Sequence, residues 1–166
     1  RDRSPSRGLG DVYKRQKPFC IENNIGIICY STLAQGLLTG RYKDVSEVPE
    51  GVSRSRLFSR TTSSLCRHID DGCEDELFDA IDKIINFSNE QNMSPATIAT
   101  TWLKKQSGVL SLLIGARNSK EVQLNVNSFN YEIDESLLNE YISITDKIKK
   151  HIGNNPDMWN AVSEYR

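Results

Sequence analysis

The stretch IGIICYSTLAQGLLTGRY, residues 25–42, decides the fold, because a short apolar run passes directly into hydroxyl groups and glycines. Its first six residues are apolar without alternation, which is typical of a strand covered on both faces, as in a parallel sheet. A second such run, VLSLLI at residues 109–114, is closed by Gly115. The two runs predict two parallel strands, each followed by a polar turn.

Two helical patterns lie between these runs. From Glu74, apolar residues recur at the spacing of one helix face. The members of this stripe are Leu77, Phe78, Ile81, Ile84, Ile85 and Ser88. A second helix is expected to begin at Ser94-Pro95, because serine is a preferred cap and proline a preferred first residue. Its core face carries Ile98, Ala99, Trp102 and Leu103.

Two further helices are predicted after the second strand. Asn118 is expected to cap the first of them in a capping-box-like arrangement with Glu121, with Val122 and Val126 on the core side. Asp134 is expected to cap the last helix. Its inward residues are Leu137, Leu138, Tyr141, Ile144 and Ile148. Gly153 and Pro156 end that helix, and Trp159 and Tyr165 are expected to anchor the tail.

Residues 43–74 are polar, without clear period, and contain Arg54, Arg56 and Arg60. Loops of this length are usually functional or mobile, so we expect a solvated basic loop. The order of strands and helices predicts an α/β fold. Two strands make no closed sheet and leave open edges, so the chain is expected to be part of a larger α/β unit.

The chain has 166 residues, 37% of them apolar, and a formal net charge of -1. This length suits one domain with a core. The absence of a basic excess argues against a nucleic-acid or membrane-surface binder. No apolar run approaches the roughly 20 residues that span a bilayer.

The first 16 residues differ from the rest. They hold five basic and two acidic residues, a net of +3, and the remainder carries a net of -4. Residues 6–16 resemble an in-frame translation of a sequencing adapter, although a native basic arm is an alternative. We therefore expect residues 1–16 to be non-native or disordered and the domain to cover residues 17–166.

The four cysteines, at positions 20, 29, 66 and 73, form no C-x-x-C pair. His68 and His151 are the only imidazoles, so no zinc site is expected. Free thiols are typical of a reducing compartment, which favours a cytoplasmic location.

Candidate chemistry lies at the carboxyl ends of the two predicted strands, where α/β folds bind ligands. The first segment, residues 30–42, offers an aromatic ring, hydroxyl groups, glycines and Arg41. The second, residues 115–119, leads into a helix N-terminus and contains Arg117, both of which favour anions. Together they suggest a split site for one extended diphosphate ligand.

Both segments resemble a known family. Residues 26–42 resemble the seventh-strand segment of the aldo-keto reductases, and Ile114-Gly115-Ala116-Arg117-Asn118 with Val122 and Asn125 resembles their eighth-strand nucleotide segment. Residues 94–103 are similar to the family's seventh barrel helix. The resemblance covers about residues 18–150 and implies the C-terminal portion of a (β/α)8 TIM-type barrel, incomplete in this chain, that binds NADP(H).

The resemblance also implies roles for single residues. Tyr30 would stack on the nicotinamide, and Arg41 and Arg54 would clamp phosphate. Gly115 and Arg117 would approach the adenosine 2′-phosphate. The remaining implied contacts are Ser31, Leu33, Ala34 and Gln35 along the pyrophosphate, Glu121 beside the 2′-phosphate, and Asn125 on adenine.

The chain departs from the family at three points. Thr32 stands where the family usually has proline, and Leu124 stands where a glutamate commonly binds the adenine amine. The family's catalytic Asp, Tyr, Lys and His belong to earlier strands, so no catalytic residue is assigned here. We expect this chain alone to show no reductase activity.

The function implied by the resemblance is hydride transfer between NADP(H) and a small carbonyl substrate. The alternative is a nucleotide-binding regulatory subunit with the same barrel. A third interpretation is another phosphate-binding barrel enzyme, an aldolase or isomerase. That class typically needs a lysine or glutamate at an inner strand end, and neither predicted strand has one. No nucleic-acid or membrane partner is expected, and neither substrate nor oligomeric state is predicted.

Overall fold

Two parallel strands and a set of helices make up the computed structural model, which describes residues 17–153, 158 and 159. The elements run α2 (Lys17–Glu22), β1 (Ile27–Cys29), the 3-10 turns η2 (Ala34–Thr39) and η3 (Val45–Glu47), α3 (Glu74–Glu90), α4 (Pro95–Lys104), β2 (Val109–Leu112), α5 (Ser119–Ser128), α6 (Glu135–Ile144) and α7 (Asp146–Ile152). The predicted α/β class is confirmed. The expectation for residues 1–16 lies outside the described residues.

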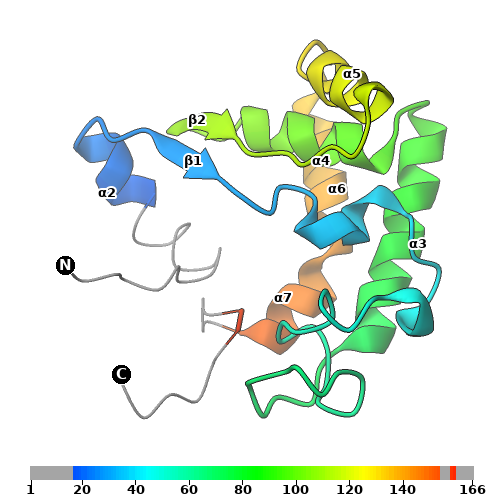
Figure 1. Cartoon of the computed structure of the whole chain (residues 1–166). Helices are drawn as coiled ribbons and strands as arrows, with labels where there is room; N and C mark the ends of the chain where they lie inside the picture. The colour runs from blue at the N-terminus through cyan, green and yellow to red at the C-terminus, as the bar shows by residue number, and fades with distance from the viewer. Residues whose placement is uncertain (1–16, 154–157, 160–166) are drawn as a thin grey trace.

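The strands pair in parallel, with Ile28 opposite Ser111 and Cys29 opposite Leu112. Helix α4 packs against β2 and also contacts η2, α3 and α5, and α3 contacts α6 and α7. Figure 1 shows the strands at one side of the molecule and α3 at the other. Within the described residues, the helices therefore cover the strands on one side only.

That arrangement corrects the prediction that both strand faces are covered. Ile28 is 57% exposed and Leu110 is 76% exposed. Ile27 and Cys29, which flank Ile28 in β1, are half-buried. The apolar pattern of the two runs is present, but the described chain supplies partners for one side of each strand.

The helix predictions are largely confirmed. Ser94 caps α4 by accepting from the amide of Thr97, and Asn118 caps α5 by accepting from that of Glu121. In α3 the buried face is Leu77, Ala80, Ile81, Ile84, Phe87 and Ser88. Phe78 and Ile85 lie at its margin, partly buried.

Three helix predictions are corrected. Val122 and Val126 of α5 are 51% and 57% exposed rather than buried, because no described element lies over them. The segment expected to form one last helix forms two helices, α6 and α7, which are separated at Thr145. Asp134 occupies the cap position of α6, but its side chain makes no cap hydrogen bond.

The expected solvated loop is also corrected. Between η3 and α3 the chain forms a compact unit at the foot of α3 (Figure 1), in which Phe58 and His68 are fully buried. Arg56 is 9% exposed and forms an ion pair with Asp70. The loop belongs to the core together with Leu77 and Ile81 of α3.

All four cysteines are free, as predicted. Cys66 and Cys73 are buried in this loop, and burial, with the charges of Glu76 and Glu74 beside it, raises the pKa of Cys73 to about 11. Of the predicted tail anchors, Trp159 lies beneath Arg54, whose guanidinium carbon is 5.8 Å from the ring centroid. Tyr165 lies outside the described residues.

Candidate functional site

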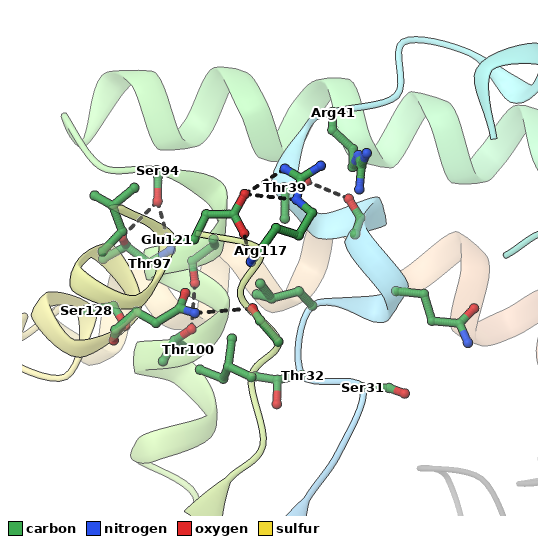
Figure 2. Close-up of a pocket in the computed structure, with 18 of the residues that line it drawn as sticks. Ser31, Thr32, Thr39, Arg41, Ser94, Thr97, Thr100, Arg117, Glu121 and Ser128 are labelled. Carbon is green, nitrogen blue, oxygen red and sulfur yellow. Dashed lines mark hydrogen bonds and ion pairs between the residues drawn. The ribbon is translucent and has the colours of Figure 1, made fainter. Parts of the chain in front are cut away.

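A cavity of about 470 Å³ opens where β1 and β2 end. Its walls are the turn that follows β1, the segment between β2 and α5, the first turns of α4 and one side of α5 (Figure 2). The carboxyl ends of both parallel strands therefore meet at one site, as the sequence predicts. Pockets that bind small ligands commonly measure about 300–1,000 Å³.

The wall after β1 is a tight turn with several left-handed residues. The φ angles of Ser31, Gln35 and Gly36 are 52°, 57° and 98°. A Cβ at position 36 would lie 3.1 Å from Cδ of Arg41, so a side chain there is disfavoured by space as well as by φ. The hydroxyl of Thr32 donates to the Leu113 carbonyl at 3.0 Å and ties this turn to the end of β2.

The opposite wall is the start of α5. The guanidinium of Arg117 donates from Nη2 and Nε to Oε1 of Glu121, at 2.6 and 3.0 Å. The Arg117 amide donates to Oε2 of the same carboxylate at 2.7 Å. Asn125 donates from Nδ2 to the Gly115 carbonyl at 3.3 Å, which fixes the strand exit against the helix.

Charge in the cavity is predominantly positive. Arg41 and Arg117 contribute two guanidinium groups, and Glu121 is the carboxylate beside them (Figure 2). Hydrogen bonding to Arg117 lowers the pKa of Glu121, and the same bond raises the pKa of Arg117. Both groups are therefore charged at neutral pH. The N-terminus of α5 adds a partial positive charge at the same wall.

The structure brings most of the predicted residues together. Those that line this cavity are Ser31, Leu33, Gln35, Arg41, Gly115, Arg117, Glu121 and Asn125. Tyr30 and Ala34 line a second cavity of about 210 Å³, which shares Ser31 and Thr32 with the first. Arg54 lines neither of these two cavities and lies instead against Trp159.

Hydroxyl groups of α4 and α5 are the part of the site that sequence reasoning missed. Ser94, Thr97 and Thr100 line the cavity from the first turns of α4, and Ser128 lines it from the end of α5. The signal was present, since Ser94-Pro95 marks a helix start and helix starts attract anions. The capping role that the sequence predicts for Ser94 is also present, since its hydroxyl accepts from the amide of Thr97 at 3.0 Å.

The described residues hold no cluster of three or more His, Cys, Asp or Glu side chains placed to bind a metal ion. Over the same part of the chain, no helix combines the length and apolar character needed to cross a bilayer.

Known proteins with similar sequences include reductases and a putative channel subunit. An aldo-keto reductase of Schizosaccharomyces pombe named for NADP(+) is 27% identical over 121 residues, which are 73% of this chain and 33% of that protein. A putative voltage-gated potassium channel subunit beta from the same yeast is 28% identical over 123 residues, 74% of this chain and 33% of that protein. The chain thus spans about a third of the length of these relatives.

The fold has a solved counterpart. A glycerol dehydrogenase from Gluconobacter oxydans matches with a TM-score of 0.63 at 20% identity, over 87% of this chain and 40% of that one. The family model for the aldo/keto reductase family matches residues 11–146, which include both strands, the cavity and the helices α3 to α6. The chain therefore belongs to the aldo/keto reductase family.

Proposed function

We propose that this chain is the nucleotide-binding portion of an NADP(H)-dependent oxidoreductase that interconverts a small carbonyl compound and its alcohol. The observation that carries the proposal is the cavity between the two strand ends, which joins two arginines, a helix N-terminus and a row of hydroxyls. The same proposal takes the fold as the C-terminal portion of a (β/α)8 barrel, with residues 17–166 as its domain.

The residues present fit a dinucleotide. Phosphate oxygens would accept from the guanidinium groups of Arg41 and Arg117 and from hydroxyls such as that of Thr97. A Cβ at Gly115 would have no neighbouring atom within 4 Å, so the strand exit leaves open space at that point. The volume of about 470 Å³ suits the phosphate-bearing part of such a ligand.

Tyr30 suits the other end of the ligand. Its ring follows β1 and is 51% exposed, so a face is available for stacking on a flat heterocycle. Ser31 lines both cavities and connects the ring with the phosphate-binding wall. In this proposal Tyr30 orients the nicotinamide, while Ser31, Leu33, Ala34 and Gln35 line the path of the pyrophosphate.

The bound nicotinamide supplies the hydride, and the residues of this chain bind and orient it. None of them is assigned as the acid or base that moves the proton on the carbonyl oxygen. We therefore propose that this chain alone has no reductase activity. Four free cysteines, two of them buried, fit a reducing compartment, and we propose a cytoplasmic location.

A second candidate function is a nucleotide-sensing subunit without rapid turnover. The similarity to a putative potassium channel subunit beta favours it. The two functions differ in turnover and share nucleotide binding. Steady oxidation of NADPH by the intact protein with a carbonyl compound identifies the enzyme, and binding without turnover identifies the sensor.

Titration of the purified protein with NADPH, followed by nucleotide fluorescence, tests the shared part of the proposal. The wild type is expected to bind, and Arg117→Ala is expected to weaken binding about 10-fold to 100-fold, the loss of one charge-assisted hydrogen-bonded contact. Lys120→Ala is the matched control, because it removes a positive charge from the first turn of α5 outside the cavity. Equal effects of the two substitutions, or a wild type that does not bind, would contradict the proposal.

A further inference from the structure

Glu121 occupies the donors that an incoming phosphate would use. Its two carboxylate oxygens accept three hydrogen bonds from one residue: the amide, Nε and Nη2 of Arg117. Nε and Nη2 are two of the guanidinium donors through which arginine grips a phosphate in a forked geometry. In this structure that grip is already engaged, by a carboxylate of the same chain.

The pair is placed where it can open. The side chain of Arg117 is 69% exposed, and that of Glu121 is 29% exposed. An ion pair that faces water contributes little to stability, so the guanidinium can exchange partners at small cost. The backbone amide of Glu121 donates to the side-chain oxygen Oδ1 of Asn118 at 3.0 Å, and this contact does not depend on the Glu121 side chain.

We propose that Glu121 is a specificity-determining residue, which disfavours a nucleotide with a 2′-phosphate relative to one with a free 2′-hydroxyl. The inference rests on the proposed function and takes the adenosine ribose to lie beside Arg117, the position that the family resemblance of the sequence implies. Glu121 acts by holding the Arg117 fork closed and by keeping a negative charge where the extra phosphate must lie.

The two ribose substituents meet this carboxylate differently. A phosphate monoester brings a charge of about −1.5 to −2 at neutral pH, so it must displace the carboxylate from the fork and is repelled by it. A hydroxyl is neutral and can donate to the carboxylate while the pair with Arg117 stays formed. Arg41 lines the same cavity and offsets part of the repulsion, so the phosphorylated nucleotide is disfavoured rather than excluded.

The test uses two probes that differ only in this group, adenosine 2′,5′-bisphosphate and adenosine 5′-monophosphate, titrated by calorimetry at low ionic strength. Glu121→Gln keeps the shape of the side chain and an oxygen that accepts from the Arg117 amide, but it removes the charge. We expect Glu121→Gln to bind the bisphosphate at least 5-fold more tightly than wild type. Its affinity for the monophosphate is expected to change less than 2-fold.

Glu135→Gln is the control, because it removes the same charge at the start of a different helix, outside the cavity. It is expected to leave the affinity ratio of the two probes unchanged. The ratio separates selectivity from folding, since damage to the site weakens both probes together. Added salt should shrink the gain of Glu121→Gln for the bisphosphate, because the effect is electrostatic.

Two failures are distinguishable. If both probes bind the wild type and Glu121→Gln leaves their ratio unchanged or shifts it toward the monophosphate, the inference is overturned and the proposed function stands. If the wild type binds neither probe and no NADPH, the proposed function is overturned and the inference with it.

Discussion

The loop at residues 48–73 and the strand pair β1–β2 have burial opposite to their polarity. The loop is polar in sequence, yet Phe58 and His68 are fully buried in it. The strands are apolar, yet Leu110 is 76% exposed. Burial thus depends on which other segments of the chain lie nearby, and local polarity alone does not determine it.

The loop packs into the core with several of its polar groups bonded within the chain, although Nε2 of the buried His68 has no hydrogen-bond partner among the described residues. The Thr62 hydroxyl and the Ser59 amide both donate to Oε1 of Glu74 at 2.6 Å. Arg56 binds Asp70 and also donates to the Ile152 carbonyl at 2.9 Å, which joins the loop to the end of α7. Buried polar groups that are hydrogen-bonded no longer oppose packing around an aromatic ring.

The largest expected effect is that of removing the aromatic ring of the loop. Phe58→Ala should lower the free energy of unfolding by about 3–5 kcal/mol, because it empties a fully buried position. Leu110→Ala removes an apolar side chain from the exposed strand face and should cost less than about 0.5 kcal/mol. Urea unfolding followed by circular dichroism measures both.

The same two variants can also show that the contrast between a buried loop and an exposed strand face is wrong. A cost above about 2 kcal/mol for Leu110→Ala would mean that the strand face is covered in solution, by a partner segment or by another copy. A cost below about 1 kcal/mol for Phe58→Ala would mean that the loop is not part of the cooperative core.

A smaller effect is expected at Gly72, which joins the loop to α3. Its φ is +79°, and a Cβ there would lie 2.5 Å from the amide nitrogen of Ser59 and 2.7 Å from the carbonyl carbon of Phe58. Gly72→Ala should therefore destabilise the protein by about 1–3 kcal/mol, through backbone strain and displacement of the loop. The thermal midpoint should fall accordingly.

Gly51 provides the control within the same loop. A Cβ at this position would meet no atom within 4 Å, and its φ is not positive. Gly51→Ala should leave the thermal midpoint unchanged or raise it slightly, because alanine restricts the unfolded chain. Equal destabilisation by the two alanines would show that the fit around Gly72 is not the cause.

Elements with a local signal were predictable from the sequence. Ser94 and Asn118 start helices through their own side chains, and the structure has both caps. The exposure of Val126 and the break at Thr145 have no such signal, since they depend on which elements pack nearby. The compact loop was missed for the same reason, because Phe58 is a single aromatic residue in a polar segment.

The candidate site follows a similar division. The ends of the two strands and the start of α5 could be located from the sequence, and the structure brings Arg41 and Arg117 to one cavity. The pairing of Arg117 with Glu121 needs side-chain geometry, which a capping pattern does not specify. Arg54 carries the same charge as Arg41, but the fold of the loop places it against Trp159.

The smallest expected effect concerns the pH dependence of the loop. Burial acts to raise the pKa of Glu74, but hydrogen bonds from Thr62 and Ser59 outweigh it and hold the pKa below its ordinary value of 4.5. A carboxyl whose pKa is lowered by folding adds stability above its unfolded pKa. That stability is lost as the pH falls through the lower, folded value.

Glu74→Gln should therefore cost at most about 1 kcal/mol at pH 7, since the carboxylate is partly exposed and screened. The difference from wild type should shrink as the pH falls from the unfolded pKa of 4.5 through the lower, folded pKa, because the carboxyl is then protonated in both states. Glu76→Gln removes a charge from the same first turn of α3, at an exposed position. If the two substitutions change the pH profile of urea unfolding equally, the effect arises from the charge at the helix N-terminus. If only Glu74→Gln changes the profile, the hydrogen bonds from the loop to Glu74 are the cause.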